Sequence, residues 1–208
     1  MGRFALVRWI APALLLFPAH GSAARAELPA AEASVLAKAQ VDLPAALAQF
    51  VRGRVALMGP EQVAAQYMMP NGGPGAASVT IFIRPAGAPL HDELTATEQD
   101  IGLIFQGLTK VRDLAVPPNA PGSLGRLWSG QLHGNPILTG IMLSDRNGWR
   151  IKIRGTVSAE HGETGWAHID GLIREFHSAS ASRRSEPITR QRFQPRSAAI
   201  DGVVLSPI

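Results

Sequence analysis

The sequence predicts an α+β fold, in which an antiparallel sheet of about five to six strands packs with a long central helix and a C-terminal helix. Three observations support this. Residues 149–154 alternate apolar and cationic side chains, residues 89–108 carry apolar side chains at helical spacing, and turn signals such as Asn147-Gly148 divide the segment 124–157. Runs of strands separated by helices are typical of the α+β class.

The N-terminal third predicts one short helix and two or three strands. Residues 28–40 are rich in Ala and Leu, which favour a helix, and residues 51–57 (VRGRVAL) follow as a first strand. Residues 76–86 (AASVTIFIRPA) alternate β-branched and other side chains, which indicates a buried strand. The segment EQVAAQYMMP, which precedes this strand, is where a third strand would lie if the region has three. Because a strand and not a helix follows the loop NGGPG at 71–75, we interpret that loop as a hairpin turn and not as a phosphate cradle.

Residues 89–108 (PLHDELTATEQDIGLIFQGL) predict the long central helix. Its first turn carries Asp92 and Glu93, which the helix dipole favours. The acids and His91 fit the solvated side of an amphipathic helix better than a functional cluster. A weak strand follows over residues 109–118.

A three-strand meander follows, formed by LGRLWSGQL, PILTGIML and WRIKIRGTV. In the last strand Trp149, Ile151 and Ile153 point one way, and the cations Arg150, Lys152 and Arg154 point the other. Such alternation indicates one buried and one wet face. A solvated face or a guard against edge pairing explains the cations more simply than a ligand-binding ladder, which remains the alternative.

The stretch HGETGWAHID at 161–170 has the greatest density of potentially catalytic or metal-binding side chains. We interpret it as the start of the C-terminal helix, beginning within 163–166. At 100° per residue, His168 and Asp170 lie on opposite flanks of the apolar stripe, about 160° apart. His161 and His168 would be about 10 Å apart along a helix, too far for one zinc ion. Three histidines elsewhere in the predicted mature chain remain as potential distant ligands: His91, His133 and His177.

Other catalytic motifs are not matched. The chain has no P-loop and no H-E-x-x-H, and PGSLG at 121–125 lacks the first glycine of a nucleophile elbow. With no cysteine, thiol catalysis, disulfides and cysteine-ligated zinc are excluded. The sequence therefore predicts no catalytic residue, cofactor site or metal site.

The N-terminus predicts export. A positive n-region, a short apolar run interrupted by prolines and an A-x-A site at Ala24 and Ala26 together are typical of a secretory signal peptide over residues 1–26. We therefore expect signal-peptidase cleavage after Ala26, a single domain over residues 27–179, and a periplasmic or secreted protein.

The charge distribution argues against a nucleic-acid partner. The whole chain has a net charge of +4, but residues 27–179 contain 12 basic and 14 acidic residues. The surplus lies in the predicted signal peptide and in residues 180–208, whose composition predicts a basic and mostly disordered tail. A nucleic-acid-binding domain needs a basic face on its folded body. Weak contact of the tail with an anionic surface remains a hypothesis.

The pieces AASVTIFIRPAG, GRLWSG, ILTGIML, GWRIKIRGTV and GLIREF, in this order, resemble small exported bacterial proteins of uncharacterised function with a PsbP-like layout. The resemblance covers roughly residues 45–178. It implies an accessory or binding role and assigns no functional residue. We therefore expect a non-catalytic periplasmic accessory or binding protein that engages an envelope protein or a small ligand. The alternative is a metal-dependent or hydrolytic envelope enzyme using scattered His and acidic residues.

Overall fold

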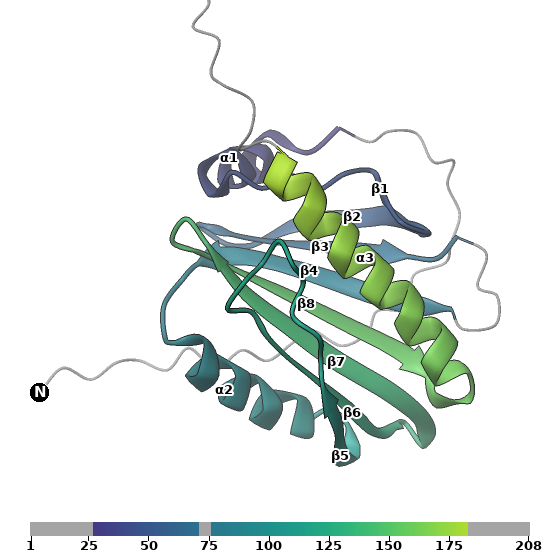
Figure 1. The fold of residues 1–208 in the computed structure, drawn as a ribbon. Coiled ribbons are helices and arrows are strands. Elements are labelled where there is room, and N and C mark those ends of the chain that lie inside the picture. The colour runs from purple at the N-terminus through teal and green to yellow at the C-terminus, as the bar shows by residue number, and fades with distance from the viewer. Residues whose placement is uncertain (1–26, 71–75, 183–208) are drawn as a thin grey trace, which may run out of the picture.

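The protein is built on one curled antiparallel sheet of eight strands, in the order β1-β2-β3-β4-β8-β7-β6-β5 (Figure 1). The structure is a computed structural model, and it describes residues 27–70 and 76–182. The strands are β1 (Ala46–Leu47), β2 (Phe50–Gly59), β3 (Gln62–Met68), β4 (Ala77–Pro85), β5 (Gln106–Asp113), β6 (Leu124–Leu132), β7 (Asn135–Arg146) and β8 (Trp149–Ser158).

Three α-helices in the described part of the chain cover the sheet on both faces. These are α1 (Ala30–Ala39), α2 (Leu90–Gly102) and α3 (Gly162–Ser182). Helices α1 and α3 lie on one face, here called the α1/α3 face, and α2 lies alone on the other, here called the α2 face (Figure 1). Helix α2 contacts β5, β6 and β7, so it covers only one half of its face.

Tight turns set the register of the central strands. Asn147 and Gly148 have φ values of 49° and 78°, and His133 and Gly134 have 51° and 81°. Two consecutive positive-φ residues give the turn whose twist matches a β-hairpin. These turns pair Arg146 with Trp149 and Leu132 with Asn135. The fixed register decides which side chains of each strand point to the α1/α3 face and which point to the α2 face.

The larger hydrophobic core lies between the sheet and α1 and α3. Two glycines allow α3 to approach the strands closely. A Cβ at Gly140 would lie 2.3 Å from Cη2 of Trp166, and one at Gly155 would lie 2.8 Å from Cδ1 of Ile169. A smaller core lies under α2, formed by Leu94, Ile101, Phe105, Trp128, Ile137, Ile141 and Leu143.

The predicted fold class is wrong on two points. The sheet has eight strands and not five to six, because the two-residue β1 and the Ala- and Gln-rich β3 carry little strand signal. The central helix is also not long: α2 ends at Gly102, after 13 residues. Phe105 and Leu108 fit the helical spacing, but Phe105 packs from the connecting turn and Leu108 belongs to β5.

The predicted domain boundaries lie near the two ends of the described part of the chain. The predicted signal peptide, with Ala24 and Ala26, lies outside the described residues, as do residues 183–208. The backbone of α3 runs to Ser182 and so extends into the predicted tail. Among the described residues no helix has the length and hydrophobicity to cross a bilayer.

Candidate functional site

The cations of β8 lie on the α2 face, as the alternation of the sequence predicts, but they occupy different environments. In the register with β4, Arg150 pairs with Arg84, Lys152 with Phe82, and Arg154 with Thr80. Arg150 is buried, whereas Lys152 and Arg154 are half-buried. The row therefore divides into a structural arginine and two cations that face the open part of the sheet.

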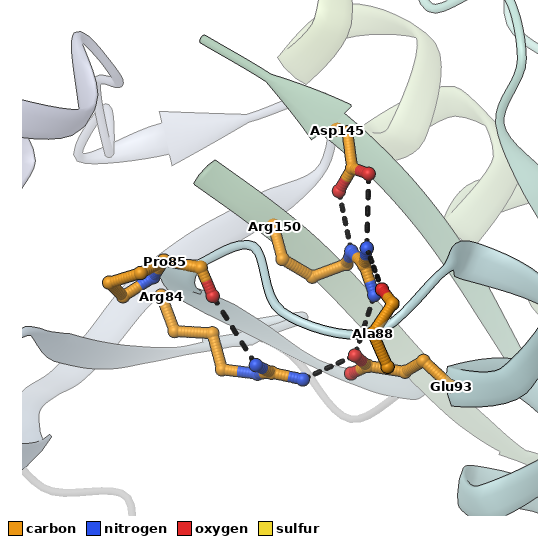
Figure 2. A network of polar contacts seen from close by, with 6 residues as sticks. All are labelled: Arg84, Pro85, Ala88, Glu93, Asp145 and Arg150. Atoms are coloured by element: carbon orange, nitrogen blue, oxygen red, sulfur yellow. Dashed lines mark hydrogen bonds and ion pairs between the residues drawn. The ribbon is translucent and has the colours of Figure 1, made fainter. Parts of the chain in front are cut away.

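Arg150 is the centre of a buried polar network (Figure 2). Its Nε and Nη2 donate to the Asp145 carboxylate over 2.5 and 3.0 Å, and its Nη1 donates to Oε2 of Glu93 over 2.6 Å. Its Nη2 also donates to the Ala88 carbonyl over 2.8 Å. Arg84 forms a second ion pair with Glu93. The hydrogen bonds that Arg150 donates to Asp145 are the main reason that the pKa of Arg150 is raised.

This network balances its charges, with two arginines against two carboxylates. A buried charge is tolerated when it is paired and hydrogen-bonded. Glu93 belongs to the first turn of α2, and Ala88 lies just before it. The Arg150 network therefore fixes the N-terminal end of α2 to β7 and β8.

A second set of contacts holds the middle of α2 to the other edge of the sheet. Glu98 accepts hydrogen bonds from Nε1 of Trp128 over 2.9 Å and from Nη1 of Arg126 over 2.8 Å. Arg126 also contacts Asp113 of β5, whose pKa is lowered first by a hydrogen bond from Lys110 and then by Arg126. With both anchors, α2 is held over β5–β7.

The remaining half of the α2 face, over β3, β4 and β8, has no helix above it within the described residues. Apart from the exposed Met68 and Ser158 and the buried Arg150, its side chains are half-buried, in contrast with the buried residues that alternate with them on the same strands. We call the part that β4 and β8 contribute the open strip; its residues are Ser78, Thr80, Phe82, Lys152, Arg154 and Thr156.

Lys152 has an aromatic partner and no ion pair among the described side chains. Its Nζ lies 5.4 Å from the centroid of the Phe82 ring, which is within cation–π range. Burial lowers its pKa, and the charge of Glu93 opposes that effect. The ammonium group is thus oriented by Phe82 without being neutralised by a bonded carboxylate.

Arg154 forms no hydrogen bond or ion pair with any described residue, and burial alone lowers its pKa. Its neighbours on the same face are Thr80 on β4 and Ile141 on β7. A partly desolvated guanidinium retains five donors and binds carboxylate or phosphate strongly. Arg154 is therefore the cation of the open strip best able to accept an external anion.

The open strip ends in a groove of about 370 Å³ between the end of β3 and the beginnings of β4 and β7. Ser78 and Thr156 line both the groove and the strip, since they are paired across β4 and β8. Its other lining residues are mostly apolar: Met68, Met69, Ala76, Ala77, Asn135, Pro136, Ile137, Val157 and Ser158. The volume lies within the range of small-molecule sites.

The residues of HGETGWAHID do not meet in one place. His161 belongs to a short 3-10 turn (Ala159–His161) that precedes α3. His168 contacts the side chain of Gln49 over 2.7 Å. Asp170 lies elsewhere: burial raises its pKa, and the charges of Arg112 and Arg174 oppose that effect. Apart from His161, the stretch belongs to the first half of α3, which begins at Gly162, one residue before the predicted range 163–166.

The remaining histidines are also separated. His91 is exposed in the first turn of α2, and His133 is exposed in the β6–β7 turn. His177 is buried on α3, where desolvation first and the charge of Arg146 second lower its pKa to about 4. Within residues 27–70 and 76–182, no three His, Asp or Glu side chains form a group that could hold a metal ion.

Sequence reasoning missed the Arg150 network. Of the two acidic partners of Arg150, Glu93 lies 57 residues before it in the sequence and Asp145 lies five residues before it. Only the proximity of Asp145 to Arg150 across the Asn147-Gly148 turn was a usable signal, because a two-residue hairpin pairs these positions.

No family model and no curated protein matches the chain. The solved structures that are similar to the chain at a distance include the following two. One is PA94 from Pseudomonas aeruginosa, of unknown function, with 12% identity and a TM-score of 0.42 over 61% of this chain and 94% of that chain. The other is CalU16 from Micromonospora echinospora, with 16% identity and a TM-score of 0.25 over 65% of this chain and 92% of that chain. These similarities are too distant to indicate a function, and the PsbP-like resemblance stays a prediction.

Proposed function

We propose that the protein is a non-catalytic binding or accessory protein that acts in the periplasm or outside the cell, and that it binds an anionic ligand on the open strip. The observation that carries the proposal is Arg154, a half-buried guanidinium without an acidic partner among the described residues. Lys152 places a second cation beside it on the same face.

The arrangement supports binding more than chemistry. The strip offers two cations and the hydroxyl of Thr80, groups that can hold and orient an anion. The predicted signal peptide supports a location outside the cytoplasm. An envelope ligand or partner that presents a carboxylate or phosphate would fit such a surface.

The proposal is tested by backbone-amide NMR of the mature protein with acetate or inorganic phosphate at low ionic strength, where screening is weak. Either anion is expected to shift the amides of Thr80, Arg154 and Thr156. Arg154→Gln should remove these shifts. The matched control Arg174→Gln removes the same charge from the exposed side of α3, beyond the α1/α3 face, and should preserve them.

Shifts that are absent, or that persist in Arg154→Gln, would overturn the proposal. Elemental analysis of the purified protein addresses the rival enzyme separately. A stoichiometric transition metal, together with hydrolysis of an envelope substrate, would favour a metal-dependent hydrolase.

A further inference from the structure

The open strip and the groove form one continuous surface with a charged part and an apolar part. Along β8, Arg154 and Thr156 point to the same face, and two residues of an antiparallel strand span about 7 Å. Thr156 lines the groove. The Arg154 guanidinium, which no described residue pairs, therefore lies about one strand repeat from the groove.

The two parts differ in what they can bind. Met68, Met69, Pro136 and Ile137 give the groove an apolar lining without a charged side chain. On the strip, Lys152 is oriented by Phe82, whereas Arg154 keeps its donors free among the described residues. One guanidinium matches one carboxylate through two parallel N–H···O bonds.

From this continuity we infer that the ligand is a carboxylic acid with a single aliphatic chain, whose carboxylate pairs with Arg154 and whose chain lies in the groove of Met68 and Ile137. This inference rests on the proposed function and specifies the chemistry of its ligand. Charge complementarity selects the head group, and the lining of the groove selects the aliphatic chain. The volume of about 370 Å³ suits a small ligand.

The test compares decanoate, hexanoate, acetate, decanol and decyl phosphate by calorimetric titration of the mature protein, below the micellar concentration of each. Each methylene buried contributes about 0.8 kcal/mol, a factor of about four. Decanoate should therefore bind at least tenfold more tightly than hexanoate, even if only about two of the four additional methylenes are buried. Decanol should bind at least tenfold more weakly than decanoate, because the charge-assisted bonds are lost.

Two variants assign the two ends of the ligand. Arg154→Gln should weaken decanoate about tenfold and leave decanol unchanged, whereas Arg174→Gln should change neither. Ser78→Phe fills the groove from a half-buried strand position; it should weaken decanoate and decanol alike and leave acetate shifts at Arg154 intact. Circular dichroism and thermal unfolding check that each variant folds.

The failures are distinguishable. If acetate binds as tightly as decanoate and Ser78→Phe has no effect, the aliphatic ligand is overturned while anion binding stands. If decyl phosphate binds and decanoate does not, the carboxylate head group is overturned. If no anion shifts the open strip, the proposed function fails together with this inference.

Discussion

Replacing Arg150 with methionine tests the view that a buried ion network anchors α2. Methionine keeps much of the aliphatic volume and removes the guanidinium. The side chain of Arg150 is 1% exposed and that of Glu93 is 7% exposed, so removal leaves a buried carboxylate with one partner fewer. Losing one partner of a buried pair costs about 3–5 kcal/mol.

We expect Arg150→Met to cost about 3 kcal/mol, at the lower end of this range. Two features reduce the cost: Asp145 is 42% exposed and can return to water, and Glu93 retains Arg84. At about 2–4 °C per kcal/mol for a chain of this size, the melting temperature should fall by about 6–12 °C.

The matched control is Arg84→Met, which removes the other arginine bound to Glu93. The side chain of Arg84 is 29% exposed, and exposed ion pairs are worth about 0–1 kcal/mol. Urea unfolding followed by circular dichroism gives both free energies of unfolding. Equal losses for the two variants, or a loss below about 1 kcal/mol for Arg150→Met, would refute the reasoning.

Three further predictions concern α3 and the N-terminus. The pKa of His177 in the folded state, about 4, lies below its unfolded value, so stability is complete above about pH 6.5 and falls by about 3 kcal/mol as the pH drops to 4. Urea titrations of His177→Phe should lack this part of the pH dependence, and identical profiles would disprove it. Gly140→Ala should destabilise the protein by about 1–3 kcal/mol, because the added Cβ would clash with Trp166. The control Gly102→Ala, whose added Cβ has no atom within 4 Å, should be neutral or stabilising by up to about 1 kcal/mol. Thermal unfolding that ranks the two variants in the reverse order would contradict the close packing of α3. Mass spectrometry of the exported protein should find Glu27 as its first residue, and an intact leader would refute processing.

The parts of the fold that could be predicted are those in which one local pattern decides the structure. The alternation in 149–154 and the Asn147-Gly148 turn specify strand, faces and hairpin together. The end of α2 could not be predicted, because Phe105 and Leu108 are apolar at spacings that a helix, a turn and a strand all satisfy.

The strand number and the candidate site depend on contacts between distant residues. Strand β5 is exposed along almost its whole length, so no buried period marks it and its sequence predicts only a weak strand over residues 109–118. Its pairing with β6 keeps it in the sheet. Likewise, only Asp145, which the Asn147-Gly148 turn pairs with Arg150, distinguishes Arg150 from Arg154 in the sequence. Glu93, which α2 brings to the sheet, pairs with the buried Arg150, whereas no described carboxylate pairs with Arg154.

The central claim is that Arg154 binds a carboxylate, and the NMR signal of its side-chain Nε–Hε group tests it most directly. During titration of the mature protein with decanoate, we predict that this signal shifts and saturates together with calorimetric binding, while the Arg174 signal stays in place. An Arg154 signal that does not move as decanoate saturates the protein, or a titration in which decanoate does not bind, would contradict the account.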